Sequence, residues 1–166
     1  MTSDQPLHTI QFGPYRALGM SYIGKNQNQE IRALWEQFLP RLCSDLAPLM
    51  RGGCVGVCRC VPGKSDGTFE YVAALLASPE ATVPEGLIAV DIPQGEYAAF
   101  NVPELDQCMA AWQSSAAQLT ASEEFSAYCG TEGCDCATHP SFEFYPPDYR
   151  GCGPFSLYMP VKRKSA

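Results

Sequence analysis

The chain has 166 residues, enough for one domain with a substantial core, and its content of 46% hydrophobic and 17% charged residues excludes a disordered chain. Its 18 acidic residues outnumber 11 basic ones, for a net charge of -7. The short basic segment 162–164 is too small to favour direct nucleic-acid binding. The acidic balance fits a cationic partner better.

The ends of the chain carry no recognisable targeting or membrane signal. Residues 1–8 lack the basic and apolar regions of a leader, and no apolar run approaches the roughly 20 residues needed to cross a bilayer. We therefore expect a cytoplasmic protein without membrane contact. In a reducing compartment, the nine cysteines are expected to be thiols. Residues 1–8 and 163–166 are expected to be tails of a single domain, 9–162.

The first half is predicted to contain a strand, a helix and two more strands. The first strand covers about 15–22, and a helix follows from a possible N-cap at Asn28. Strands are expected at 54–61, with Val55 and Val57 on one face, and at 68–76. The helix has one apolar face formed by Ile31, Leu34, Trp35, Phe38, Leu42 and Leu46.

The second half, after a linker at 78–86, repeats this plan. Strands are predicted at 87–92 and 96–102, and Pro103 opens a helix. A polar, Cys-rich loop (120–139) leads to strands at 141–145 and 155–161. The expected apolar positions of this helix are Leu105, Met109, Trp112, Ala116 and Leu119. The sequence thus predicts an α+β fold of two strand-helix-strand-strand halves, about 9–77 and 87–162, related by a pseudo-twofold axis with a concavity between them.

Glu143 is the main candidate functional residue, because it lies within the aromatic segment Phe-Glu-Phe-Tyr. Side chains alternate across a strand, so Glu143 and Tyr145 share one face while Phe142 and Phe144 share the other. From the residues alone, Glu143 is either a solvated strand residue or a carboxylate held in a pocket. Glu70, also between aromatic residues, is a second and less favoured candidate.

Six short motifs, in order, resemble the GyrI-like family, also called bacterial transcription activator effector-binding domains. The resemblance covers about residues 15–162 and is closest to the integron-associated effector-binding branch. The motifs are Leu-Trp-Glu-Gln-Phe, Gly-Val-Cys, Phe-Glu-Tyr-Val, Ile-Pro-Gln-Gly-Glu-Tyr-Ala-Ala-Phe, Ser-Phe-Glu-Phe-Tyr and Leu-Tyr-Met-Pro-Val-Lys.

This resemblance implies an antiparallel sheet with a drug-sized pocket on the pseudo-twofold axis. Family members resembling this chain bind hydrophobic cations promiscuously and use a buried glutamate, which falls on Glu143 here. The aromatic positions of the family pocket correspond to Trp35, Tyr71, Tyr145 and Tyr158. In such a pocket, desolvation should raise the pKa of Glu143, and the rings should add cation–π attraction of roughly 0.5–2 kcal/mol.

The resemblance leaves a binding protein and an enzyme as alternatives. A stand-alone domain without a helix-turn-helix segment would sense or sequester a cationic drug, or act through a separate regulatory protein. Some GyrI-like proteins resemble hydrolases of cyclopropane-bearing compounds. There Glu143 would be a general base, and Tyr71 or Tyr158 would orient the electrophile. We favour the binding protein and expect no cofactor.

The cysteines permit a third hypothesis, a soft-metal site. The spacing Cys129-x4-Cys134-x-Cys136 followed by His139 is compatible with metal ligation, as is the series Cys54, Cys58 and Cys60. Neither is a paired Cys-x-x-Cys motif, and ordinary buried or loop thiols explain both series as well. The 129–139 loop is the better candidate.

Overall fold

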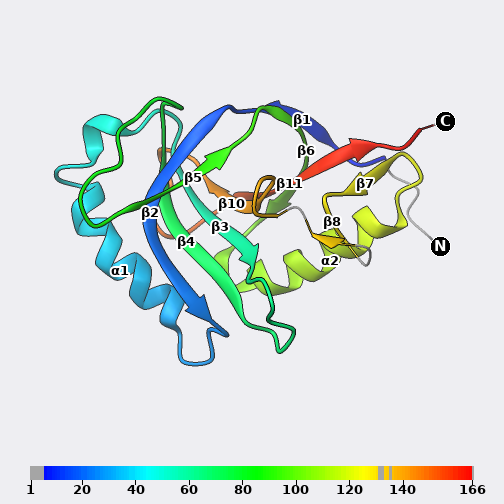
Figure 1. The fold of residues 1–166 in the computed structure, drawn as a ribbon, viewed down its shortest axis with the longest axis horizontal. Coiled ribbons are helices and arrows are strands. Elements are labelled where there is room, and N and C mark those ends of the chain that lie inside the picture. Colours follow the sequence, from blue (N-terminus) through cyan, green and yellow to red (C-terminus); the bar gives the residue numbers. More distant parts are fainter. Residues whose placement is uncertain (1–5, 131–132, 135, 166) are drawn as a thin grey trace.

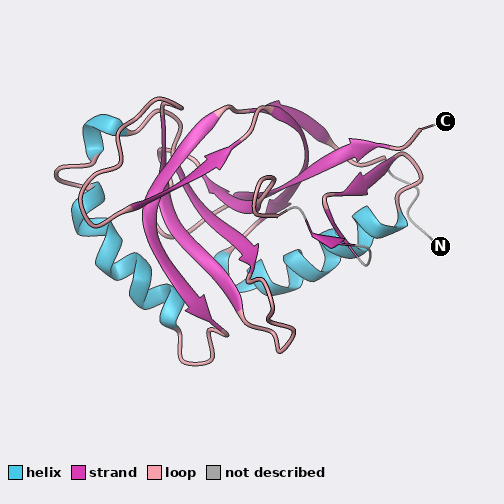
Figure 2. Cartoon of the chain, viewed as in Figure 1, coloured by secondary structure: helices cyan, strands magenta, loops and turns pink. Residues whose placement is uncertain are grey.

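One curled antiparallel sheet runs through the molecule, with two helices packed against it (Figures 1 and 2). The computed structural model describes residues 6–130, 133–134 and 136–165. The helices are α1 (Glu30–Leu42) and α2 (Cys108–Ala121), with 3-10 turns at Ala47–Leu49 and Leu105–Gln107. The strands are β1 (Thr9–Phe12), β2 (Tyr15–Gly24), β3 (Cys54–Cys60), β4 (Phe69–Ala77), β5 (Ile88–Ile92), β6 (Gly95–Val102), β7 (Phe125–Ala127), β8 (Cys129–Gly130), β9 (Gly133–Cys134), β10 (Ser141–Tyr145) and β11 (Phe155–Arg163).

The predicted two-fold plan is confirmed by the strand order, which is β1-β6-β11-β10-β3-β4-β2-β5. Its inner six strands are β6-β11-β10 from the second half and β3-β4-β2 from the first. Equivalent strands therefore lie at equal distances from the centre, where β10 pairs with β3. The fold is α+β, as the sequence predicts.

The two edge strands are exchanged between the halves. β1, from the first half, pairs with β6, whereas β5, which leads into the second half, pairs with β2. The β1–β2 and β5–β6 turns lie against each other, since a Cβ on Gly13 would be 2.8 Å from the carbonyl oxygen of Pro93. Gly13 also has a φ of +84°, which favours glycine. The sequence analysis did not predict β1 as a separate strand.

The two faces of the sheet differ in character. In register across the centre, Leu157, Glu143, Gly56 and Ala73 form one row on the face that α1 and α2 cover. The opposite face carries a second core, which is rich in aromatic side chains. Each half thus contributes to two hydrophobic layers, and the predicted alternation in β3 and β10 is confirmed.

Helix α1 packs as its apolar periodicity predicts. Phe38 is almost completely buried, and Ile31 and Trp35 pack beside it. Leu46, predicted to lie on the same helix, is also buried but follows the end of α1 at Leu42. The helix begins at Glu30, and Asn26 supplies the cap, because its Oδ1 accepts a hydrogen bond of 3.0 Å from the backbone N–H of Ile31. The expected N-cap, Asn28, does not have this role.

The predicted apolar face of helix α2 is correct at Trp112 and Leu119 and wrong at Leu105, Met109 and Ala116. Leu105, in the 3-10 turn before it, and Met109 are 50% and 69% exposed, whereas Ser115 and Leu119 are buried. Trp112 packs toward the sheet as predicted, together with Cys108 and Ala111, which were not predicted to do so. The segment 108–121 contains no charged residue, so its sequence gives little contrast between an inner and an outer face.

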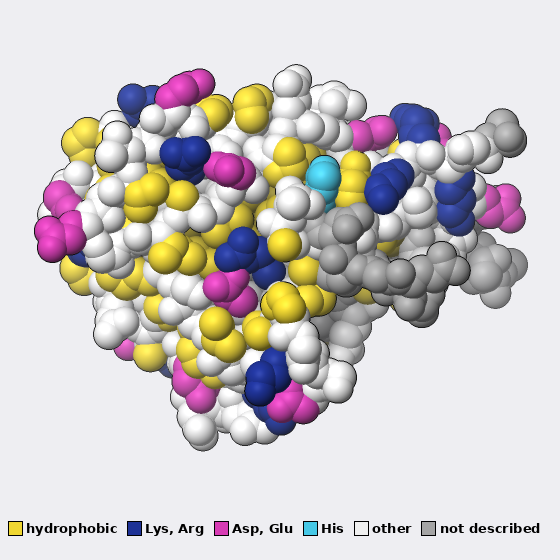
Figure 3. All heavy atoms as spheres, in the orientation of Figure 1, with side chains coloured by type: hydrophobic (Ala, Val, Ile, Leu, Met, Phe, Trp, Pro, Cys, Tyr) yellow, Lys and Arg dark blue, Asp and Glu magenta, His cyan; other side chains and the backbone are white. Residues whose placement is uncertain are grey.

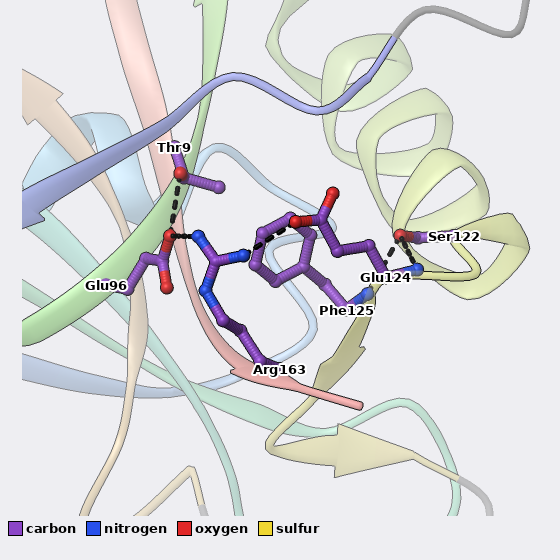
Figure 4. Close-up of polar contacts among 6 residues, drawn as sticks. All are labelled: Thr9, Glu96, Ser122, Glu124, Phe125 and Arg163. Carbon is purple, nitrogen blue, oxygen red and sulfur yellow. Dashed lines mark hydrogen bonds and ion pairs between the residues drawn. The ribbon is translucent and has the colours of Figure 1, made fainter. Parts of the chain in front are cut away.

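Charged side chains form a network at the C-terminal end of β11 (Figure 4). Arg163 donates to Glu96 of β6 (2.8 Å) and to Glu124 (2.6 Å), and its guanidinium lies 4.9 Å from the ring centroid of Phe125. The hydroxyl of Thr9 in β1 donates to the same oxygen of Glu96, at 2.8 Å. Arg163 therefore links β11 to the exchanged edge, and β11 extends one residue into the segment predicted as a tail.

Charges of both signs occur on the face shown in Figure 3, interspersed with hydrophobic side chains, and dark-blue side chains gather toward the C-terminal end of the chain. Within the described part of the chain, no helix has the length and apolar content needed to cross a membrane.

Candidate ligand-binding site

Glu143 lies at the centre of the sheet, on the face covered by the helices. It pairs with Gly56 of β3 and Leu157 of β11, and only 5% of its surface is exposed. Because Gly56 has no side chain, the tyrosine of the next strand can reach across it. A Cβ on Gly56 would be 2.0 Å from the hydroxyl oxygen of Tyr71.

Two tyrosine hydroxyls donate hydrogen bonds to the same carboxylate oxygen. Tyr145 is 3.0 Å and Tyr71 is 3.4 Å from Oε2 of Glu143. Trp35 of α1 donates in turn from Nε1 to the Tyr71 hydroxyl, at 2.9 Å, and its ring meets that of Tyr145 edge to face at 5.7 Å. The structure therefore brings four of the five predicted ligand-binding residues into one cluster, here called the Glu143 cluster: Glu143, Trp35, Tyr71 and Tyr145.

Burial dominates the electrostatics of this carboxyl group. Desolvation raises the pKa of Glu143 to about 7, although hydrogen bonds from Tyr145, Tyr71 and the Cys108 thiol each lower it. No Lys, Arg or His side chain among the described residues forms an ion pair with Glu143. Within the described part of the chain, the ionised carboxylate thus has hydroxyl and thiol donors but no compensating positive charge.

Thiols complete the surroundings of Glu143. Burial raises the pKa of Cys54 to about 11 and that of Cys108 to about 12, with the charge of Glu143 adding to the shift at Cys108. Burial followed by the Glu143 charge also holds the pKa of Cys58 well above its usual range. These thiols are protonated at neutral pH, so they contribute apolar volume and weak donors and do not resemble activated nucleophiles.

A cavity of about 480 Å³ adjoins the Glu143 cluster. Its lining includes Cys58, Ser141 and Met159, the sheet residues beside Glu143 on the same face, and Trp112 of α2. Phe69, Tyr128 and His139 line it further out. Glu143 itself does not line the cavity. The volume is in the range of sites for drug-sized molecules.

Tyr158 is not part of the cluster. It pairs with Phe142 across β10 and β11 and lies on the opposite face, where its ring stacks on Phe144 at 5.2 Å and contacts Phe12. Its separation from Glu143 corrects the predicted set of five residues. Glu70, the less favoured candidate, forms an ion pair with Arg59 and accepts a hydrogen bond from Ser21.

Two of the predicted metal-binding residues, Cys129 and Cys134, fall outside the side chains that the structure describes. Cys136 is buried and its sulfur accepts a hydrogen bond of 3.1 Å from the backbone N–H of Cys60, while His139 stacks on Tyr128 at 4.0 Å. The described side chains contain no group of three or more metal ligands placed to hold an ion. A metal site that includes Cys129 and Cys134 stays a prediction.

Three residues beside Glu143 or the cluster were missed or given little weight at the sequence level. Cys108 was not singled out, because Met109 was predicted to face the sheet in its place. Trp112 was judged a core residue, although it lines the cavity. Tyr149 lies in the loop after β10 and contacts Tyr145, with ring centroids 4.9 Å apart. This loop is rich in Pro and Gly and has no periodic pattern, so the sequence did not single out that tyrosine.

The curled antiparallel sheet with two helices is a fold that other solved structures share. A similar fold occurs in SAV2435 bound to tetraphenylphosphonium, with a TM-score of 0.68 and 15% identity over 95% of this chain and 94% of that one. An integron cassette protein of Vibrio cholerae is also similar, with a TM-score of 0.60 and 14% identity over 95% of this chain and 97% of that one. A bacterial transcription regulation protein of Staphylococcus aureus MU50 is also similar (0.57, 16%, 95% and 98%).

The amino-acid sequence assigns the chain to a protein family. The model of the family described as integron-associated effector binding protein matches residues 11–161, and the chain belongs to that family. It is also 28% identical over 153 residues to the transcriptional regulator BrlR of Pseudomonas aeruginosa. That match covers 89% of this chain but 52% of BrlR, so the chain spans about half the length of this relative. The family resemblance seen in the motifs is confirmed.

Proposed function

We propose that this protein binds hydrophobic organic cations and that Glu143 supplies the counter-charge. The observation that carries the proposal is a buried carboxyl group that has no cationic partner among the described residues and is surrounded by the rings of Trp35, Tyr71 and Tyr145. An organic cation would supply the missing charge, and low local polarity would strengthen the attraction. The tetraphenylphosphonium bound to SAV2435, a protein of the same fold, supports this ligand class.

The apolar part of the ligand is proposed to occupy the 480 Å³ cavity, with its charge turned toward Glu143. Cys58 and Trp112 line this cavity beside the cluster, so a ligand would approach the carboxylate past these two side chains. Recognition based on charge and apolar contact tolerates many ligand shapes, which favours multidrug binding over binding of one compound.

The test is cation binding by wild type and Glu143→Gln, measured by calorimetry with tetraphenylphosphonium and by fluorescence with rhodamine 6G. The substitution keeps the size and removes the charge, so affinity should fall more than about tenfold, or about 1.4 kcal/mol. Glu36→Gln is the matched control, because that carboxylate is exposed on α1, pairs with Arg32 and does not line the cavity. Equal affinity of Glu143→Gln and wild type would refute the proposal.

A hydrolase remains the second candidate, favoured by one observation. The pKa of Glu143, at about 7, is close to the ideal for a general base at neutral pH, and Tyr71 is placed to orient a substrate group. Tyr158 cannot share that role from the other face. Mass spectrometry of the bound compound after prolonged incubation separates the two functions. A binding protein returns the ligand intact, whereas a hydrolase consumes it.

The biological output is proposed to be sensing or sequestration. BrlR is a transcriptional regulator of about twice the matched length, which supports a regulatory context for this kind of domain. A separate regulatory protein would then read the ligand-bound state. Co-purification with and without tetraphenylphosphonium tests this, and ligand-independent recovery of the same proteins would argue against it.

A further inference from the structure

Tyr149 is held beside the Glu143 cluster by the loop between β10 and β11, residues 146–154. Its backbone N–H donates to the carbonyl oxygen of Pro146 (2.9 Å), which forms a tight turn directly after β10. At the other end of the loop, the N–H of Gly153 donates to the carboxylate of Glu104, at 3.1 Å. The loop is therefore tied to the segment that leads into α2.

The ring of Tyr149 packs against the cluster. Its centroid lies 4.9 Å from that of Tyr145, the residue that donates to Glu143, and 6.2 Å from that of Phe155. The same apolar group contains Trp35 and Trp112, which come from α1 and α2. The aromatic wall of the site thus includes a loop residue as well as residues of the regular elements.

The hydroxyl of Tyr149 is buried and has no hydrogen-bond partner in the part of the chain that the structure describes. By contrast, the hydroxyls of Tyr71 and Tyr145 donate to Glu143, and that of Tyr97 donates to the carbonyl oxygen of Pro93. An unsatisfied buried hydroxyl destabilises the protein, so its retention next to a candidate ligand site calls for an explanation.

The charges around this hydroxyl indicate what it would bind. Burial raises the pKa of Tyr149, and the negative charges of Glu104 and Glu143 raise it further. The hydroxyl thus lies in a negative environment, which favours an N–H group carrying partial or full positive charge as its partner. A ligand acceptor would bring more negative charge to the same place.

We propose that Tyr149 is a specificity-determining residue of the cation site and that its hydroxyl accepts a hydrogen bond from an N–H group of the ligand. The ligand class is aromatic cations with amino N–H groups, distinguished from cations of similar size that carry only alkyl substituents on nitrogen. This inference rests on the proposed function and adds a second polar contact to it. Glu143 recognises the charge, and Tyr149 recognises the amino group.

The test compares two dyes with the same tricyclic cationic core. Rhodamine 6G has ethylamino groups with N–H bonds, and tetramethylrhodamine ethyl ester has dimethylamino groups without them. Tyr149→Phe should weaken rhodamine 6G about 5- to 15-fold, the effect of one hydrogen bond, and change the affinity for the second dye less than about twofold. Tyr158→Phe, which removes a hydroxyl from the opposite face, should affect neither dye.

A second measurement needs no dye. Removing an unsatisfied hydroxyl should raise the Tm of the ligand-free protein by about 2–4 °C in Tyr149→Phe. An unchanged or lower Tm, or equal effects on the two dyes, would overturn the inference. If Glu143→Gln weakens both dyes while Tyr149→Phe weakens neither, the cation site stands and only the role of Tyr149 fails. If wild type binds neither dye, both proposals fail.

Discussion

Replacing Glu143 by Gln should remove a pH dependence from the stability of the ligand-free protein. The pKa of Glu143 is about 7 in the folded chain and about 4.5 when exposed in the unfolded chain. The folded state therefore holds the proton more tightly. The stabilising contribution of the protonated group is fully present below pH 4.5 and is lost as pH rises through about 7. The amide introduced by Glu143→Gln would not titrate.

The size of the effect follows from these two pKa values. They differ by about 2.5 units, and each unit corresponds to about 1.4 kcal/mol, so the full change is about 3 kcal/mol. Between pH 5 and pH 8, the unfolding free energy of wild type should fall by about 2.5 kcal/mol through this group alone. This is a large fraction of the 5–15 kcal/mol typical of domain stability.

Urea unfolding at pH 5 and pH 8, followed by tryptophan fluorescence, measures this quantity. The other titrating groups are common to both proteins, so the difference between the pH effects in wild type and Glu143→Gln isolates Glu143. Equal pH effects, within about 0.5 kcal/mol, would show that the carboxyl group is solvated in the folded state. The assignment of a buried counter-charge would then be wrong.

Two further predictions concern the neighbours of Glu143. Tyr145→Phe removes a hydrogen-bond donor that lowers the pKa of Glu143. The pH at which cation affinity is half-maximal should therefore move upward, and binding below pH 7 should weaken about tenfold. A pH–affinity profile that does not shift would contradict this. Gly56→Ala places a methyl group on the buried hydroxyl of Tyr71 and should lower the unfolding free energy by about 1–3 kcal/mol. Gly95→Ala, where a Cβ meets no atom within 4 Å, is its control, and equal urea midpoints for the two would refute the close approach.

The sequence predicts what depends on local periodicity. The alternation of Phe142, Glu143 and Phe144 places the carboxyl group opposite the phenylalanines, and the structure confirms it. Tyr158 could not be placed in this way, because its face depends on the register between β10 and β11. That register is set by pairing between strands, which single-strand periodicity does not determine.

The remaining differences have separate physical causes. Helix α2 lacks charged residues, so sequence periodicity could not show that Cys108 faces the sheet near Glu143. Tyr149 lies in a loop, where position depends on individual turns and on the contact of Gly153 with Glu104. Whether Glu143 is buried could not be decided from its own segment. The family resemblance, and not the residues alone, favoured the pocket.

The exchange of edge strands limits how this chain can be divided. Its plan repeats, yet β1 lies on the second half and β5 on the first, so neither half contains its own complete sheet. A cut in the exposed linker before β5 would leave two fragments that each need a strand from the other. Such fragments would be partners in reassembly and not two small domains, and the carboxylate between β3 and β11 would regain its burial only when they rejoin.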